Sequence, residues 1–366
     1  MTGLYLHIPF CARKCPYCDF YSVRFDRQLV CDYTDALVRN IRHLADTKTD
    51  IDTIYFGGGT PSLLSCSQVE SILSAAAASF SLHDPEVTLE ANPCTADVQK
   101  LDGYRRAGVN RLSFGVQSAN DSELSLLGRL HNFERAEKAV FDAAAAGFDN
   151  ISCDLMLGTA GQTLQSLANS VDALCALPIK HISAYMLKIE KGTPYDCGEM
   201  RNASADDELM SEMYLQTVEN LASAGFVQYE ISNFAKPGFE SRHNLKYWTG
   251  ESYIGLGASA HSFFGGKRYA CPNDVNAFVS ADVQQNTVTD EAPDALEEYL
   301  MLGLRLTKGV SLERLQKLGA DIGVLSQKVA LFSQYGLMQS GGGRFSLTSK
   351  GFLLSNSIIS ELLTVI

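Results

Sequence analysis

The chain has 366 residues, of which 46% are hydrophobic and 20% charged, so it can bury a sizeable core and is not generally disordered. At about 150 residues per domain, this length predicts about two domains, although an α/β barrel can occupy about 200–250 residues alone. The formal net charge of −12 argues against a protein held on nucleic acid by phosphate contacts.

Short runs rich in β-forming residues recur along the first half of the chain, and each is followed by a longer helical pattern. The runs that predict strands are residues 4–10, 51–56, 87–91, 111–117, 150–157 and 181–189. Alternating strands and helices imply parallel pairing through right-handed crossovers. Six such units fall short of the eight of a closed barrel, so we predict an α/β fold with an open, partial (β/α)6 barrel. A doubly wound sheet is the alternative.

The rest of the chain divides at two changes of pattern. After a barrel over residues 1–226, residues 227–290 are rich in turns and predict an irregular connecting region. Residues 291–366 contain helices, a short strand pair and a final helix, which predict a small winged-helix-like α+β domain. That domain carries equal numbers of basic and acidic residues, so we expect it to be a packing or interaction module and not a DNA-binding one.

Cysteine usage and the N-terminal sequence indicate the compartment. Most of the ten cysteines are scattered singly, and no signal peptide or membrane-spanning run is apparent. A reducing cytoplasm is the expected location, where a tight cluster of cysteines favours metal binding over a disulfide.

Such a cluster follows the first predicted strand. Cys11, Cys15 and Cys18 have the spacing C-x3-C-x2-C, and "CDFYS" continues without a fourth cysteine. Thiolates are soft ligands that select iron–sulfur clusters and zinc, but structural zinc sites usually need four protein ligands. Three thiolates suit a cubane cluster with one iron open to an external chelator. A zinc loop completed by a distant His or Cys, or an accidental grouping, remains the alternative.

Polar and glycine residues recur where other predicted strands end. "GGGTP" at 57–61 follows one strand directly, and Glu90, Gln117 and Asp154 lie at or near the ends of three more. Parallel α/β proteins build their sites at the carboxyl ends of strands, so these residues should converge. Each alone could be an ordinary turn or strand-end residue, whereas the ordered set predicts a site.

These motifs carry a resemblance. "LYLHIPFCARKCPYCDFYS", "YFGGGTPSLL", "LEANP", "RLSFGVQS", "LGRLHN" and "DLMLGTAGQT" resemble, in order, the radical S-adenosylmethionine (SAM) superfamily and its oxygen-independent coproporphyrinogen III oxidase group. The resemblance implies a 4Fe–4S cluster on the three cysteines, with SAM at the open iron. It further implies that SAM is contacted by Tyr5, Tyr17, Gly58, Gly59, Thr60, Glu90, Gln117, Arg129 and Asp154. In that assignment Arg129 binds the SAM carboxylate, because a planar guanidinium can form two parallel hydrogen bonds to a carboxylate.

Two departures distinguish the chain from the oxidase itself. Its first cluster cysteine is already residue 11, and Phe20 stands where the oxidase has a further cysteine. Both departures count against decarboxylase activity. They resemble instead the HemW-type heme chaperones, which are related to the oxidase.

The segment "RHNLKYWTGESYIGLGASAHSF" at 242–263 also resembles those chaperones through its H-N-x-x-Y-W pattern. A neutral imidazole can ligate heme iron, so His243 is the candidate ligand, with Tyr247 and Trp248 as flat apolar faces. Arg242 and Lys246 could face propionates. The alternative is that His243 caps a turn and Trp248 fills a domain junction. His7 and His261 are weaker candidate ligands.

The sequence therefore predicts a heme chaperone that binds heme, a 4Fe–4S cluster and SAM and delivers heme to respiratory proteins. One alternative is an oxygen-independent coproporphyrinogen III oxidase, which performs radical SAM oxidative decarboxylation. Another is a metal-stabilised scaffold without SAM chemistry. No nucleic-acid partner is expected, and the interpretation leaves open peripheral membrane association and a homodimer.

Overall fold

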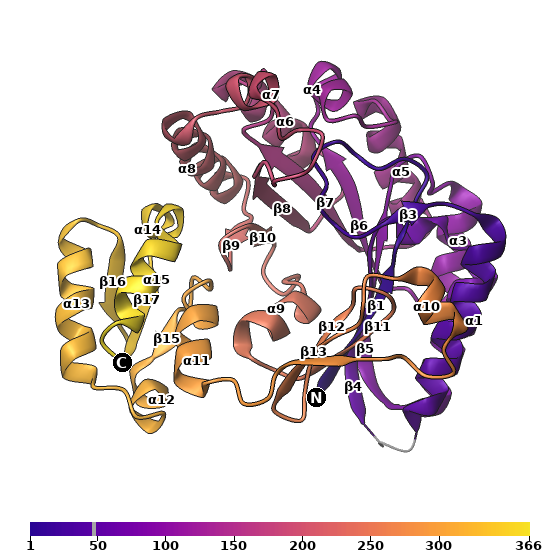
Figure 1. The fold of residues 1–366 in the computed structure, drawn as a ribbon. Helices are drawn as coiled ribbons and strands as arrows, with labels where there is room; N and C mark the ends of the chain where they lie inside the picture. The colour runs from indigo at the N-terminus through magenta and orange to yellow at the C-terminus, as the bar shows by residue number, and fades with distance from the viewer. Residues whose placement is uncertain (46–48) are drawn as a thin grey trace.

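The structure, a computed structural model, describes residues 1–45 and 49–366, and its larger part is built on one curved sheet (Figure 1). The parallel core of this sheet comprises β1 (Thr2–Ile8), β4 (Asp50–Gly58), β5 (Ser81–Ala91), β6 (Arg111–Gln117), β7 (Asn150–Leu157) and β8 (His181–Met186). These strands pair in chain order, each parallel to the next. The prediction of an α/β fold with six parallel strands is confirmed.

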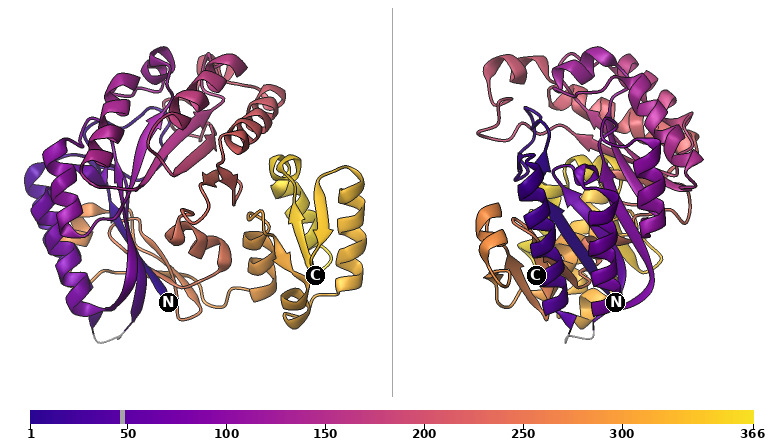
Figure 2. Two further views of the ribbon diagram at one scale, coloured as in Figure 1. Left: turned by 180° about the vertical axis from the view of Figure 1, so that it is seen from behind. Right: turned by 90° about the vertical axis from the view of Figure 1, so that its right-hand side faces the viewer.

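Helices between the strands cover the outer face of the sheet (Figure 2). They are α1 (Arg27–His43), α2 (Cys66–Ser79), α3 (Val98–Ala107), α4 (Asp121–Leu126), α5 (Phe133–Ala145), α6 (Leu164–Cys175), α7 (Gly198–Ala203) and α8 (Asp207–Ser223). Side chains that accept from free amides define several helix starts: Asp26 accepts from the Leu29 amide, and Ser65 forms a capping box with Gln68. Apolar residues on one face of each long helix then pack on the sheet.

Residues 227–290, predicted to be irregular, instead extend the sheet at both edges. They form β9 (Val227–Gln228), β10 (Asn233–Ala235), α9 (Arg242–Thr249), β11 (Tyr253–Leu256), β12 (His261–Phe264), β13 (Lys267–Ala270), α10 (Val275–Ser280) and β14 (Thr287–Asp290). β10 pairs antiparallel with β8, and β11 pairs parallel with β1. Strands of two to four residues are too short to show an alternating pattern, which explains why the sequence did not predict them.

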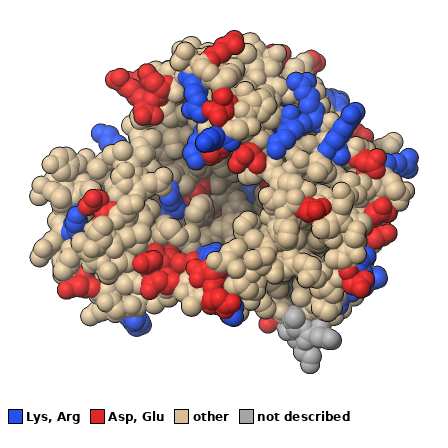
Figure 3. Space-filling model, in the orientation of Figure 1, with Lys and Arg blue, Asp and Glu red and all other residues tan. Residues whose placement is uncertain are grey.

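The barrel is open. Its sheet runs in the order β14-β13-β12-β11-β1-β4-β5-β6-β7-β8-β10-β9, so within the described residues its two edges are different strands and do not pair with each other. Figure 3 shows that this face is hollowed near its centre, inside the curve of the sheet, and that charges of both signs are interspersed around it. The interior of the partial barrel is thus accessible at this mouth.

The C-terminal part is a small α+β unit beside the barrel (Figure 1). It contains α11 (Ala295–Gly303), β15 (Val310–Ser311), α12 (Leu312–Lys317), α13 (Ile322–Gln334), β16 (Met338–Gly341), β17 (Arg344–Leu347), α14 (Ser349–Leu353) and α15 (Ser355–Leu363). The strands form an antiparallel sheet in the order β15-β17-β16, as expected of a winged-helix-like fold. A bridge between Glu230 and Leu306 ties the unit to the segment that carries β9 and β10.

One finding bears on membranes. Among the helices that the structure describes, none has the length and apolar character needed to cross a bilayer.

Candidate functional site

The cysteine loop lies at the carboxyl end of β1. Two short parallel strands, β2 (Phe10–Cys11) and β3 (Val23–Arg24), close the base of this loop, and the Phe25 amide donates to the Cys11 carbonyl at 2.9 Å. The three thiols are half-buried. The predicted cluster residues therefore lie on one closed loop directly above the sheet.

The thiols also share one electrostatic environment. Burial raises the pKa of Cys18, and the neighbouring Cys15 and Cys11 raise it further. Arg129 Nη1 donates to Cys15 Sγ at 3.5 Å, and Thr60 Oγ1 donates to Cys11 Sγ at 3.7 Å. Over residues 1–45 and 49–366, no three His, Cys, Asp or Glu side chains are grouped closely enough to bind one metal ion. A cubane cluster does not need such a group, because each thiolate binds a different iron.

The glycines after β4 allow the cysteine loop to approach the sheet. Gly58 has a φ of +115°, and a Cβ there would come within 2.7 Å of the His7 ring. A Cβ on Gly59 would come within 2.7 Å of the Phe10 carbonyl oxygen. Glycine is therefore required here by contacts within the protein. Gly58, Gly59 and Thr60 nevertheless remain beside the cysteine loop, where the sequence placed them.

Two buried carboxyl groups lie on the strands that flank β6: Glu90 near the end of β5 and Asp154 within β7. Glu90 accepts from the Tyr55 hydroxyl at 2.9 Å and from the Gly58 amide at 3.2 Å. Burial and the charge of Asp154 raise the pKa of Glu90 to about 7. Burial likewise raises the pKa of Asp154 to about 6, against hydrogen bonds from Ser183 and Ser113. A cationic ligand between the two groups would favour their ionised forms.

Gln117 and Arg129 show features of a site prepared for a ligand. The β6–β7 register shifts before Gln117, whose φ of +76° is unusual for a side chain other than glycine. Arg129 Nη2 donates to the Gly115 carbonyl at 2.6 Å. Gln117 Oε1 and Arg129 Nε are buried without a hydrogen-bond partner in the described part of the chain. Strain and unpaired polar atoms are characteristic of functional sites.

Of the two predicted tyrosines, Tyr5 lies on β1 before the cysteine loop and Tyr17 lies within the loop. The Tyr5 hydroxyl and His7 Nδ1 are hydrogen-bonded at 3.0 Å. Arg129 and Cys15 are close enough to influence the Tyr17 hydroxyl, and burial is the main cause of its raised pKa. Tyr17 is thus part of the contact between the loop and the strand-end residues.

Sequence reasoning missed several residues that support this site. Tyr55, Ser113 and Ser183 hydrogen-bond the two carboxylates, and Tyr195 holds the loop through its amide, which donates to the Pro16 carbonyl at 3.1 Å. Tyr55 directly precedes Phe56 and the glycine run, so its position was a usable signal. The serines and Tyr195 offered none, because their partners are distant in sequence.

His243, the predicted heme ligand on α9, is engaged within the protein. His243 is fully buried, and its Nδ1 and Nε2 are hydrogen-bonded to Thr53 Oγ1 at 2.8 Å and to the Tyr247 hydroxyl at 2.9 Å. Neither ring nitrogen is therefore free for iron. Burial lowers the pKa of His243 to about 3. Trp248 is partly buried on the same helix.

The basic residues of α9 are also engaged within the protein. Lys246 is 3% exposed. Its Nζ lies 2.8 Å from Asp52 Oδ1 and 2.9 Å from Glu251 Oε2. Arg242 Nη1 donates to the Asp84 carbonyl at 3.0 Å. Lys246 is therefore not free to bind a propionate, whereas the Arg242 side chain remains largely exposed.

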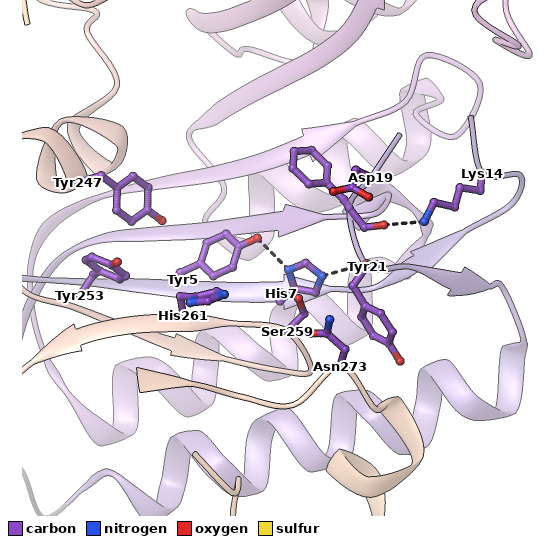
Figure 4. Close-up of a pocket in the computed structure, with 11 residues that line it drawn as sticks. Tyr5, His7, Lys14, Asp19, Tyr21, Tyr247, Tyr253, Ser259, His261 and Asn273 are labelled. Atoms are coloured by element: carbon purple, nitrogen blue, oxygen red, sulfur yellow. Dashed lines mark hydrogen bonds between the residues drawn. The ribbon is translucent and has the colours of Figure 1, made fainter. Parts of the chain in front are cut away.

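A separate cavity of about 510 Å³ lies between the cysteine loop, β1, α9 and the β11–β12 hairpin (Figure 4). Tyr5, His7, Tyr247 and His261 all line it, whereas His243 and Trp248 are not among its described lining residues. The structure thus brings Tyr247 together with the weaker histidine candidates.

The strand-end residues fit the cofactors that the sequence implies. The donor set at the loop is three soft thiols, which suit an iron–sulfur cluster. Beside them lie two carboxyl groups for cationic atoms, a guanidinium for a carboxylate, and the unpaired polar atoms of Gln117 and Arg129. A zwitterionic, sulfonium-bearing ligand such as SAM carries matching groups.

Comparisons with known proteins agree with this geometry. Residues 5–174 match the radical SAM superfamily, and residues 291–354 match the HemN C-terminal domain. A solved structure of coproporphyrinogen III oxidase (HemN) from Escherichia coli has a TM-score of 0.82 at 21% identity, over 100% of this chain and 90% of that chain. At this identity the likeness concerns the fold alone.

Relatives in sequence are closer. The chain is 36% identical to the heme chaperone HemW of Bacillus subtilis (strain 168), over 99% of both chains. It is 33% identical to the heme chaperone HemW of Escherichia coli (strain K12), over 98% of this chain and 97% of that relative. The chain therefore belongs to the HemW-type heme chaperone family of the radical SAM superfamily.

Proposed function

We propose that this protein is a heme chaperone that binds heme, a 4Fe–4S cluster and SAM, and delivers heme to respiratory acceptors such as cytochromes. The observation that carries the proposal is the match to HemW of Bacillus subtilis, 36% identical over 99% of both chains and named a heme chaperone. The proposal places this activity in the cytoplasm, and it includes a homodimer and peripheral membrane contact as states to be tested.

The cysteine loop and the strand ends supply the cofactor site in this proposal. Cys11, Cys15 and Cys18 hold the cluster, which when bound offers one-electron chemistry at an iron that no protein thiolate ligates. Arg129, already in contact with the Cys15 thiol, has an unpaired Nε with which to orient a carboxylate beside the loop. Its planar fork fixes the orientation of such a group better than a lysine would.

Glu90 and Asp154 bind the cationic and hydroxyl groups of SAM in this proposal. Because the pKa of Glu90 is about 7 and that of Asp154 about 6, Glu90 is only partly ionised near neutral pH in the free protein, whereas Asp154 is mostly ionised. An ammonium or sulfonium group nearby lowers both pKa values, so SAM binding releases protons. Gln117 contributes an oxygen that the described protein leaves without a partner.

The proposal is tested on one anaerobically reconstituted sample of the full chain. Heme is titrated while the Soret band is followed, and the same sample is assayed for protoporphyrinogen formation from coproporphyrinogen III. Saturable heme binding with negligible decarboxylation supports the chaperone. Decarboxylation without heme binding supports the oxidase, whose fold the chain shares. Zinc without iron and sulfide after reconstitution supports a scaffold.

A further inference from the structure

The cavity beside the cysteine loop has the chemistry of a site for a flat, anionic ligand. Tyr247 and Tyr253 lie at one end, Lys14 and Asp19 at the other, and His261 lies between them beside Tyr5 (Figure 4). Its volume of about 510 Å³ is within the range of about 300–1,000 Å³ that is usual for small-molecule sites. The cavity thus combines aromatic faces, two imidazoles, one cation and one carboxylate.

The aromatic side chains are positioned by contacts on their far sides. Tyr247 is hydrogen-bonded to His243 and packs edge-on against Tyr253, with ring centroids 4.7 Å apart. Phe20 lines the same cavity and is 69% exposed, although large apolar side chains normally bury their surface. A planar apolar ligand would cover these rings.

His261 differs from the two other histidines of this region. Both ring nitrogens of His7 are hydrogen-bonded, to the Tyr5 hydroxyl at 3.0 Å and to the Tyr21 carbonyl at 3.3 Å, and both of His243 are engaged as well. The His261 ring is exposed and makes no hydrogen bond to any residue in 1–45 or 49–366. Its imidazole is therefore available to a metal.

The backbone that presents His261 is strained. Ser259, two residues earlier and also in the cavity lining, has a φ of +72°. The turn is fixed from behind by the Gly257 amide, which donates to Gln284 Oε1 at 2.8 Å. Strain held in place by surrounding contacts is characteristic of binding sites.

We propose that this cavity is the heme site, with His261 as an iron ligand, Tyr247, Tyr253 and Phe20 on the porphyrin faces, and Lys14 facing a propionate. The exposed Lys14 ammonium donates to the Phe20 carbonyl at 2.9 Å and has further protons for a carboxylate. This inference rests on the proposed heme-chaperone function and assigns its ligand to particular residues. Neutral imidazole is a common heme ligand, and an ammonium pairs with a carboxylate. The heme then lies beside the cysteine loop, because Lys14 and Phe20 belong to that loop.

The test titrates hemin into the full, anaerobically reconstituted chain and compares His261→Ala with His83→Ala. His83 is a matched control, because it is an exposed histidine on β5 that contacts Asp50 and does not line the cavity. We expect His261→Ala to raise the Kd by about tenfold or more and to alter the Soret spectrum, since loss of metal-site contacts typically costs about 10–100-fold. Added imidazole should restore the spectrum. His83→Ala should leave both unchanged.

Two further variants test the charged end of the cavity. Lys14→Gln should raise the Kd by about two- to fivefold and Asp19→Asn should lower it, each with the wild-type spectrum, as expected of exposed electrostatic contacts. Unchanged unfolding temperatures would show that each variant is folded. If wild-type protein binds heme and His261→Ala has the same affinity and spectrum, the assignment is wrong while the chaperone proposal stands. If wild-type protein binds no heme, the proposed function itself is rejected.

Discussion

The strand-end site and the α9 anchor are both polar, yet they are built in opposite ways. In the site, Gln117 and Arg129 keep buried polar atoms without partners in the described chain, and burial raises the pKa of Glu90. In the α9 anchor, which comprises His243 and Lys246 with their partners, both ring nitrogens and the ammonium are bonded. The two regions thus differ in how fully their key polar atoms are paired, which supports a ligand site at the strand ends and a structural role for the α9 anchor.

The largest expected effect is on cluster content. Cys15→Ala removes one of three thiolates, and two cannot hold a cubane, so iron and sulfide per chain should fall close to background after reconstitution. Cys31→Ala, which changes an exposed cysteine on α1, should retain wild-type content. Full iron and sulfide in Cys15→Ala would contradict the assignment of the loop.

Lys246→Ala should give the largest loss of stability. It leaves Asp52 in a nearly buried position without its ammonium partner, and breaking a buried pair costs about 3–5 kcal/mol. Urea unfolding measures the change. Lys317→Ala is the control, because its ion pair with Glu313 is exposed and is worth less than about 1 kcal/mol. If both variants lose the same free energy of unfolding, the buried ion pair of Lys246 is no more stabilising than the exposed pair of Lys317.

His243→Ala should cost about 3 kcal/mol near neutral pH, since it leaves a cavity and unpairs the hydroxyls of Thr53 and Tyr247. The variant also tests a pH dependence. The folded pKa of His243 is about 3, below the ordinary value of 6.5, so the unfolded chain takes up the proton first as pH falls. Wild-type stability should therefore fall relative to the variant below about pH 6.5, by up to about 1.4 kcal/mol per pH unit. Parallel pH profiles of the two proteins would contradict this.

Glu90→Gln should have the smallest effect, and one of opposite sign. The folded pKa of Glu90 is about 7, above the ordinary value of 4.5, so its ionisation opposes folding as pH rises from about 4.5 to 7. Above pH 7 the variant should be more stable than wild type by about 1–2 kcal/mol without cofactors, while SAM binding measured by calorimetry weakens. If Glu90→Gln is instead less stable than wild type at pH 8, ionised Glu90 stabilises the fold and this prediction is wrong.

Several of these features could be predicted from the sequence. The cysteine spacing lies within eight residues, and the six strand–helix units repeat a local pattern, so neighbouring residues carry both signals. The strand-end positions of Glu90 and Gln117 follow from that repeat, because parallel strands bring their carboxyl ends to one edge.

Only the tertiary structure decided the surroundings of the histidines. His243 bonds to Thr53 across 190 residues, and His261 enters the cavity because β11 pairs with β1. Such contacts join segments far apart in the chain, and no local pattern specifies which will meet. The sequence by itself determined the cysteine loop and the parallel sheet, since both depend on local spacing and periodicity. Burial and long-range pairing decided which imidazole is held inside the protein and which is exposed in the cavity.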